Sequence, residues 1–506
     1  MANRISAYTR QRQRLVLEAS DFSGGFFPQL TDYDMNTRFV RDIQNMELVN
    51  GFWQKRKGFH LAGEFDSVRS TPNTAKGLFV FNQLGTTHIL GVFNNDLYVK
   101  RHFSGSNYGR KVYSKVHEIR RVRFTEYRSN CYIAHGKENL LKYDGDDVYE
   151  VTAPAGSIIA SYDNRLVVSG IKGDPMTLYY SEYGDGDTWP ALNFIVLDGG
   201  SHEFITALIP VHGKLFIFTN RAIYSLVGTL DNFFVTKEVD GIGAVSAEAV
   251  QVFGSRFYFV SEDSNIYEYD GGSMPRNISQ QIKPYLEANV SGYATQNVVT
   301  TTYKDAVWFT FDTSFKPEER ITLVYYPQYA AWTKFVGIPA AFYIHNRETL
   351  YFTGSHNKFS LYQYDTQHSD DGAAIDGYLR TPNWSFDALE NIKRFKTIYI
   401  RGALQGGGKS GFDVHFYIDD QKVATVRASS QDIADAPKWG SAIWGDFSWD
   451  TGELNDDVGY VYTKIYLSQY NVISGKTFSI AFQERSTDHS FRIESIRLEY
   501  IQKGAR

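Results

Sequence analysis

Residues 254–272 read GSRFYFVSEDSNIYEYDGG, and this stretch decides the fold class of the chain. An apolar run, RFYFV, is followed by a polar turn and then by an aliphatic-aromatic step that begins at Ile266. The run and the step each have the length of one β-strand, so the unit is predicted to be a hairpin.

The same unit occurs seven times between residues 97 and 364, at intervals of 38 to 57 residues that average 44. A β unit that recurs about every 40–50 residues is typical of a propeller blade, a four-stranded sheet that must pack on its neighbours to bury both faces. The chain is therefore predicted to be all-β, with a β-propeller of about seven blades. The seven steps begin at Leu97, Leu140, Leu178, Ile223, Ile266, Leu323 and Leu361.

The repeat stops on both sides of this region, which indicates three parts. Residues 1–70 lack the pattern and are predicted to be an extended N-terminal arm and docking segment, and residues 71–374 form the propeller. In residues 375–506, six strand-like runs are separated by turns rich in Gly, Asp and Ser, which predicts a β-sandwich. The best helix candidate, QQIKPYLEA at 280–288, lies in the longest interval of the repeat.

Composition excludes several classes of protein. The net charge of −5 comes from well-mixed acids and bases, so the surface as a whole has no electrostatic footprint for nucleic acid. Cys131 is the sole cysteine, which excludes an internal disulfide and a cysteine-based zinc site and predicts a buried thiol. No apolar run of 18 residues and no hydrophobic signal segment occur, so we expect no membrane span and synthesis in a cytoplasm.

No catalytic motif is present: the chain has no GxSxG, no P-loop and no HExxH. We therefore expect no enzyme activity, no cofactor and no metal. Three acidic turns, at 144–147, 185–187 and 370–372, offer clustered carboxylates to Ca²⁺, but none has EF-hand spacing. We predict that they are Asx turns that close hairpins.

Two groups of residues are candidate contact sites. Four arginines precede the first acid, Glu18, and form either a solvated tail or an arm that contacts an adaptor ring or DNA. Three tryptophans in KWGSAIWGDFSWD could stack on sugar rings, or could equally pack in a core or an interface. These candidates are Arg4, Arg10, Arg12 and Arg14 in the first group, and Trp439, Trp444 and Trp449 in the second.

Several segments resemble the tail nozzle and hub proteins of short-tailed bacteriophages. They are SGGFFPQL (23–30), IQNMELVNGFWQKRKGF (43–59), YDNRLVVSG (162–170), VDGIGAVS (239–246) and the closing run FRIESIRLEYI (491–501). In length the chain resembles the compact, packaged-DNA-stabilisation type of this family and not the larger nozzles with inserted domains.

The resemblance implies a structural virion protein of the phage tail, assembled in the host cytoplasm. It implies a homo-oligomeric ring of six copies below the portal and adaptor, at the head-tail connector, which retains packaged DNA and conducts it during ejection. The implied partners are the portal and adaptor proteins, tail fibre or tail tip proteins, and double-stranded DNA in transient, non-specific contact. A conduit should not grip phosphates, and the mild negative charge fits that requirement. If the arginine arm docks on the portal complex, deletion of residues 1–14 should weaken that docking.

Two other readings stay open. One is a receptor- or carbohydrate-binding β-propeller protein, which the three tryptophans would serve. The other is a glycosidase with two carboxylates facing each other across the ring, although the sequence singles out no pair.

Overall fold

The chain divides into two compact units, each described by itself. The propeller unit is Gly58–Gln328 with Phe335–Asp371, and the sandwich unit is Met1–Lys57, Tyr329–Lys334 and Gly372–Arg506. The computed structural model describes residues 14–28, 36–66, 75–103, 105, 108–114, 116, 121–229, 232–290, 297–313, 319–354, 359–405, 411–429 and 458–502.

Seven four-stranded antiparallel sheets form the blades of the propeller. Blade 1 is β8 (Ala75–Gln83), β9 (Thr86–Phe93), β10 (Asp96–Lys100) and β11 (Arg110–Ser114). Blade 2 is β12 (Arg123–Tyr127), β13 (Asn130–Ala134), β14 (Leu140–Tyr143) and β15 (Val148–Val151). Blade 3 is β16 (Ile158–Tyr162), β17 (Arg165–Ser169), β18 (Thr177–Tyr180) and β19 (Phe194–Val196). Blade 4 is β20 (Ile205–Val211), β21 (Lys214–Thr219), β22 (Ala222–Thr229) and β23 (Asn232–Asp240).

The remaining blades follow in chain order. Blade 5 is β24 (Val250–Phe253), β25 (Arg256–Val260), β26 (Ile266–Tyr269) and β27 (Arg276–Asn277). Blade 6 is β28 (Val299–Tyr303), β29 (Ala306–Asp312), β30 (Arg320–Tyr326) and β31 (Ala331–Val336). Blade 7 is β32 (Ala340–Asn346), β33 (Thr349–Gly354), β34 (Ser360–Tyr364) and β7 (Phe59–Glu64).

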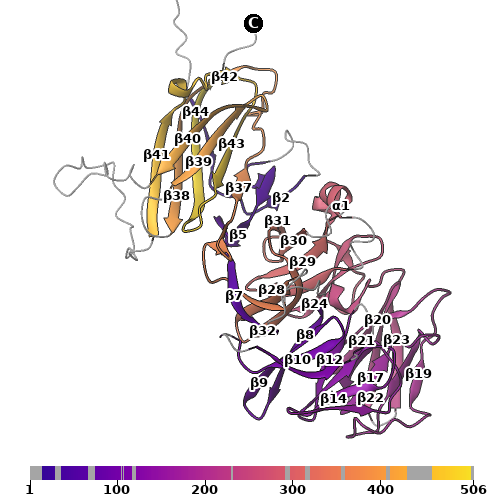
Figure 1. Cartoon of the computed structure of the whole chain (residues 1–506). Coiled ribbons are helices and arrows are strands. Elements are labelled where there is room, and N and C mark those ends of the chain that lie inside the picture. Colours follow the sequence, from indigo (N-terminus) through magenta and orange to yellow (C-terminus); the bar gives the residue numbers. More distant parts are fainter. Residues whose placement is uncertain are drawn as a thin grey trace, which may run out of the picture. The chain divides into compact units, whose positions relative to one another are not determined.

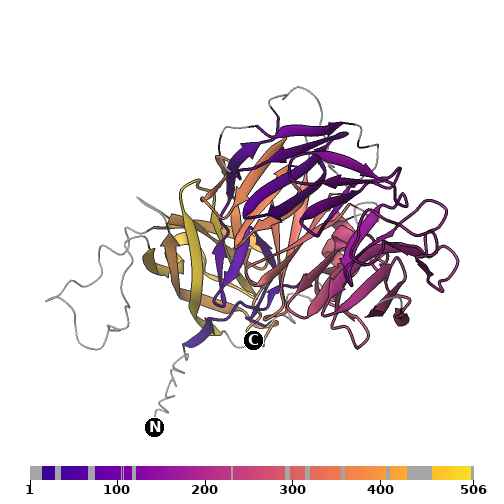
Figure 2. The ribbon, with the colours of Figure 1, turned by 90° about the horizontal axis from the view of Figure 1, so that it is seen from below.

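The ring of blades is closed by a strand from an earlier part of the chain. β7 pairs antiparallel with β34, and Glu64 lies opposite Ser360. The first strand of blade 7, β32, also contacts the first strand of blade 1, β8 (Figures 1 and 2). The predicted domain boundary at 70/71 differs from this arrangement, because β7 precedes it and belongs to the propeller. A local hairpin repeat carries no signal for a strand that pairs with a distant one.

All seven predicted steps are the third strands of their blades, and each first residue is buried, with at most 1% of its surface exposed. The predicted seven-bladed propeller is confirmed. These third strands are β10, β14, β18, β22, β26, β30 and β34.

Helical structure is sparse among the described residues. The predicted helix is present as the short 3₁₀ turn η2 (Gln280–Ile282) and α1 (Lys283–Asn289), with a proline in the first turn of α1, where its missing N–H costs nothing. Two further 3₁₀ turns are η1 (Ala247–Ala249) and η4 (Leu467–Tyr470). No helix in this part of the chain is long and apolar enough to cross a membrane.

The sandwich unit contains two main sheets. The first has the order β41 (Val458–Tyr466), β38 (Lys393–Gln405), β44 (Ser490–Gln502), β6 (Phe52–Lys55) and β5 (Met46–Val49), with β1 (Leu15–Ala19) on β44 and β42 (Ser474–Gly475) on β38. The second has the order β4 (Asp42–Gln44), β37 (Gly377–Arg380), β43 (Phe478–Glu484), β39 (Gly411–Ile418) and β40 (Gln421–Ser429). The other short strands of the chain are β2 (Gly25–Phe26), β3 (Phe39–Val40), β35 (Ser369–Asp370) and β36 (Ala373–Ala374).

All six predicted strands of the C-terminal region are present, as β38, β39, β40, β41, β43 and β44. The sequence did not indicate that β1, β4, β5 and β6, from the predicted arm and docking segment, would join the same two sheets. Those strands have three to five residues, too few to show a clear alternation.

Aromatic rings and one ion pair join the two sheets of the sandwich. The ring centroids of Phe412 on β39 and Phe491 on β44 are 5.4 Å apart. The Lys55 ammonium on β6 contacts the Glu484 carboxylate on β43, and both side chains are almost completely buried. A charge in such a position is tolerated only because it is paired.

The glycine-led segment near the start of the chain has a packing reason for its glycines. Gly25 has a φ of +70°, and a Cβ there would lie 2.7 Å from the Trp332 carbonyl oxygen. A side chain at this position would be both strained and obstructed.

Candidate functional site

The candidate residues from the sequence are only partly covered by the structure. Arg4, Arg10 and Arg12, together with Trp439, Trp444 and Trp449, lie outside the described residues. Arg14 is described: its side chain is 61% exposed, and its Nη1 lies 3.0 Å from Glu499 Oε2 on β44.

The centre of the propeller holds a cluster of partly buried charges. Glu248 in η1 accepts hydrogen bonds from Arg121 at 3.0 Å and from Arg123 at 2.9 and 3.0 Å. Arg123 also donates to the Ser157 carbonyl at 2.8 Å, and Arg121 donates to the Val298 carbonyl at 3.0 Å. These contacts connect the first strands, or the turns beside them, of several blades.

Beside this cluster lies a cavity of about 290 Å³, lined by residues of β8, β12, β16, η1, β24, β28 and β32. Its wall has both polar and apolar surface, and Phe79 and Phe124 stack there with centroids 5.5 Å apart. Burial disfavours the charged form of Glu248, but the nearby charges of Arg123 and Arg121 outweigh that effect and lower its pKa to about 2. A carboxylate held so firmly as an anion cannot donate a proton at neutral pH. The cluster is instead suited to holding the blades together around the central cavity, which we call the channel of the propeller.

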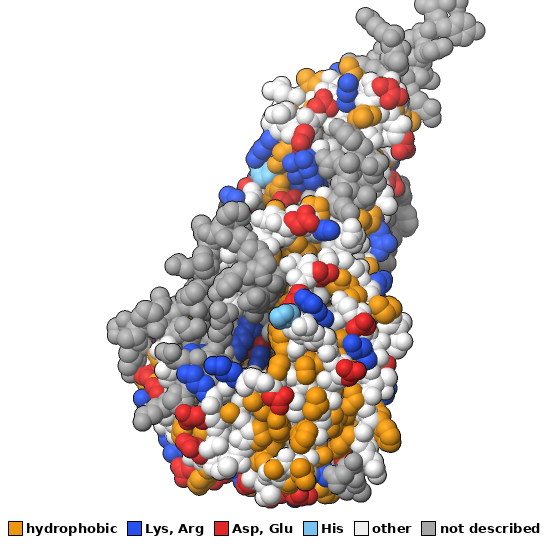
Figure 3. Space-filling model, turned by 90° about the vertical axis from the view of Figure 1, so that its right-hand side faces the viewer, with side chains coloured by type: hydrophobic (Ala, Val, Ile, Leu, Met, Phe, Trp, Pro, Cys, Tyr) orange, Lys and Arg blue, Asp and Glu red, His pale blue; other side chains and the backbone are white. Residues whose placement is uncertain are grey.

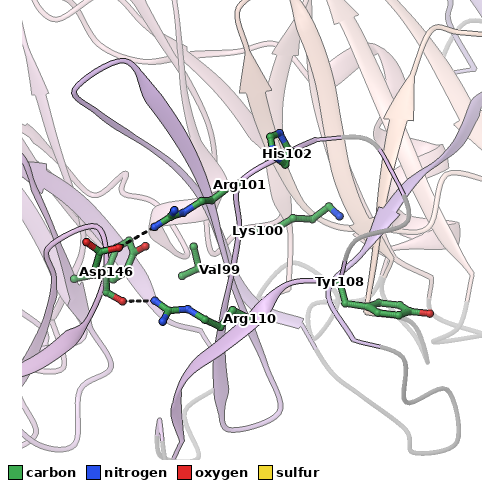
Figure 4. A pocket seen from close by; sticks show the side chains of 8 residues that line it. Val99, Lys100, Arg101, His102, Tyr108, Arg110 and Asp146 are labelled. Atoms are coloured by element: carbon green, nitrogen blue, oxygen red, sulfur yellow. Dashed lines mark hydrogen bonds and ion pairs between the residues drawn. The ribbon is translucent and has the colours of Figure 1, made fainter.

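A second cavity, of about 510 Å³, lies where blade 1 meets the turn between β14 and β15 (Figure 4). Arg101 and Arg110 point toward Asp146, whereas Lys100 extends away from it (Figure 4). Arg101 Nη2 lies 2.8 Å from Asp146 Oδ1, and Arg110 donates to the Asp146 backbone carbonyl. Both guanidinium groups therefore already have acceptors in the wall of the cavity.

That turn is one of the three acidic turns from the sequence. Asp144 Oδ1 accepts the backbone N–H groups of Asp146 and Asp147, each at 2.9 Å, and these bonds lower the pKa of Asp144. This is the predicted Asx turn. Among the described residues, no group of three His, Cys, Asp or Glu side chains is placed to hold a metal ion.

The outermost strands of blades 3 and 4 carry exposed hydrophobic side chains. Figure 3 views the side of the molecule where Figure 1 labels β19 and β23, and hydrophobic side chains gather over the lower part of that face. We call five of the residues on or next to these strands the apolar edge: Leu192 (85% exposed), Phe194 (43%), Val196 (64%), Phe234 (67%) and Val235 (37%). β19 and β23 are the outer strands of neighbouring blades, and clustered exposed apolar groups mark interaction surfaces more often than isolated ones do.

Sequence reasoning missed both the charge cluster and the apolar edge. Arg121 and Glu248 are 127 residues apart, and no spacing rule links them. The apolar edge had a local signal, the run NFFV at 232–235, which places two adjacent phenylalanines on an outer strand where alternation would place one.

No protein-family model matches the chain, and no curated protein matches it. Among solved structures, it is similar to YCF48 bound to D1 peptide, with 10% identity, a TM-score of 0.37, and coverage of 63% of this chain and 96% of that one. It is also similar to the AfRom2 CNH domain (7% identity, TM-score 0.39, 61% and 99% covered) and to a chain of the mitotic checkpoint complex (12%, 0.38, 60% and 97%). The fold assignment rests on the strand topology and not on these similarities.

Proposed function

We propose that the chain is a structural protein of a bacteriophage tail. Several copies, six by the resemblance to nozzle proteins, would form a ring below the portal and adaptor that retains packaged DNA and conducts it during ejection. The observation that carries the proposal is the apolar edge, which suits a permanent contact between neighbouring subunits.

The physical argument starts from β23, the longest of the outer strands in blades 1 to 5. As an edge strand it has unpaired backbone N–H and C=O groups, and Phe234 and Val235 add exposed apolar surface to it. Such an edge favours association with another chain, so soluble proteins usually shorten it or protect it with charge. A head-to-tail ring needs two different complementary faces on each subunit, and the apolar edge is our candidate for one of them.

The charge cluster bears on where DNA would pass in the proposed ring. Glu248, Arg121 and Arg123 join the blades at the centre of the propeller, so this channel is braced by ion pairs. In the proposed ring, DNA would run between the copies and not through the propeller of each copy.

The test is the assembly state of the purified protein, by native mass spectrometry and negative-stain microscopy, alone and with its portal and adaptor. We expect a ring with a channel of DNA width. A monomer that does not bind the portal complex would refute the proposal and would favour the carbohydrate-binding alternative.

A pair of variants tests the role of the apolar edge. Phe234→Ser removes an exposed aromatic side chain from β23. This variant should prevent assembly of the oligomeric ring while the protein stays folded. Leu84→Ser is the matched control, because Leu84 is 96% exposed in the turn between β8 and β9, away from the apolar edge in sequence. Equal effects of the two variants would show that the apolar edge is not the subunit contact.

A further inference from the structure

The outer face of the first sandwich sheet carries tyrosines and cations side by side. On β41, Tyr462, Lys464 and Tyr466 point outward in alternation with the buried Val461, Thr463 and Ile465. The register places Lys464 opposite Tyr399, Tyr399 opposite Arg497, and Tyr462 opposite Arg401. Directly opposed residues share one face of a sheet. We call these six residues the tyrosine face: Tyr399, Arg401, Tyr462, Lys464, Tyr466 and Arg497.

Two arginines on or beside this face are paired with carboxylates that are mostly buried. Arg401 Nε is 2.9 Å from Glu494 Oε2, and the arginine is 61% exposed while the glutamate is 10% exposed. Arg14, the described member of the predicted arginine group, repeats this arrangement on Glu499 with the same exposures. At Arg401 and Arg14, solvent therefore meets the guanidinium group more than its acidic partner, whereas Arg497 lies 3.6 Å from Glu18, which is 68% exposed. Because these pairs restrict the orientation of Arg401 and Arg14, binding would cost those two side chains less entropy.

Cations already lie over the rings of Tyr399 and Tyr466. Lys464 Nζ lies 5.5 Å from the ring centroid of Tyr399 and 5.0 Å from that of Tyr466, and Arg497 Cζ lies 5.9 Å from the centroid of Tyr399. Tyr462 packs beside Tyr399, with centroids 6.2 Å apart. Rings in these positions are poor platforms for stacking on unpaired bases or sugars. They instead hold the cations and leave N–H donors to face a ligand that offers oxygen acceptors.

We propose that the tyrosine face binds a carboxylate-rich surface of a partner protein. Tyrosine and arginine are enriched at the energetic centres of protein interfaces, and the planar guanidinium group pairs two N–H donors with one carboxylate. Duplex DNA fits this surface less well, since Glu18, Glu494 and Glu499 lie among the cations and would face its continuous rows of phosphates, whereas a protein surface can place single carboxylates opposite the arginines. The inference rests on the proposed function only for the identity of the partner, which in a tail would be a neighbouring structural protein.

The test measures binding of the full chain to poly-L-glutamate at low salt, with duplex DNA at equal charge concentration as the comparison. We expect binding to poly-L-glutamate that weakens by about tenfold or more in the double variant Arg401→Gln/Arg497→Gln, because two charge-assisted contacts are lost. Tyr462→Ala should weaken it as well. Both arginines are more than half exposed, so the variants are expected to keep the wild-type circular dichroism spectrum.

The matched control is Arg427→Gln. Arg427 is 60% exposed and lies 2.9 Å from Asp413, but it belongs to β40, in the other sheet of the sandwich. This variant should bind poly-L-glutamate like the wild type. The proposal is overturned if the wild type does not bind, if the control loses as much affinity as the double variant, or if duplex DNA binds more tightly than poly-L-glutamate.

The result is separable from the fate of the proposed tail function. Loss of poly-L-glutamate binding with an intact ring would overturn only the tyrosine face. Arginine-dependent binding by a chain that forms no ring would overturn only the tail function.

Discussion

Replacing Glu248 by Gln should destabilise the propeller strongly at neutral pH. The substitution keeps the size of the side chain but removes the charge that Arg121 and Arg123 contact at 2.9 to 3.0 Å. The pKa of Glu248 is about 2 in the folded protein, against an ordinary 4.5, and each unit of difference corresponds to about 1.4 kcal/mol. The charged form thus contributes about 3 kcal/mol to the free energy of unfolding, in the range typical of breaking a buried ion pair.

The pH dependence has a definite sign. The folded-state pKa lies below the unfolded-state value, so the stabilisation is complete above pH 4.5 and is lost as the pH falls toward 2. Urea unfolding, followed by tryptophan fluorescence, should show the largest gap between wild type and Glu248→Gln at neutral pH and a shrinking gap below pH 4.5. Comparing the two proteins at each pH cancels the contribution of all other titrating groups.

The control is Glu262→Gln, which affects a solvent-exposed pair with Arg221 at 3.9 Å. An exposed pair of this kind is worth less than about 1 kcal/mol, so the control should unfold close to the wild type. If Glu248→Gln unfolds like the control at pH 7, or if its deficit stays constant down to pH 3, the charge cluster does not brace the channel and the reasoning is refuted.

Three further substitutions or probes test the two units. Leu361→Ala, at a fully buried step of blade 7, should lower the free energy of unfolding by about 2–5 kcal/mol in urea titrations; an effect below 1 kcal/mol would contradict its place in the core. Lys55→Met should destabilise the sandwich by about 3–5 kcal/mol, because the Glu484 carboxylate is then buried without its cationic partner. Thermal unfolding followed by circular dichroism measures this loss, and an unchanged midpoint would contradict the Lys55–Glu484 ion pair. Cys131 is buried and its pKa is raised by that burial, so an alkylating reagent should modify it only after unfolding, and rapid labelling of the native protein would disprove its burial.

The predictions from sequence succeeded where the signal was local. Each of the seven steps, such as Leu140 or Ile266, is a short run whose burial follows from alternation within one strand, and all seven are third strands of blades. The helix at 283–289 and the Asx turn at Asp144 likewise depend on neighbouring residues only. The candidate contact residues were chosen by residue type, which carries no information on their position in space, and of these only Arg14 lies within the described residues.

The sequence by itself therefore determined that the chain is all-β, with a seven-bladed propeller and a sandwich. The reason is that strand length, alternation and turns depend on residues that are adjacent in the chain. Tertiary structure alone decided that β7 completes the seventh blade, that Glu248 meets Arg121 and Arg123 in the channel, and that Arg14 reaches Glu499 at the other end of the chain. Each of these contacts joins residues far apart in the chain. Their pairing depends on how whole sheets pack, and no local pattern of residues records it.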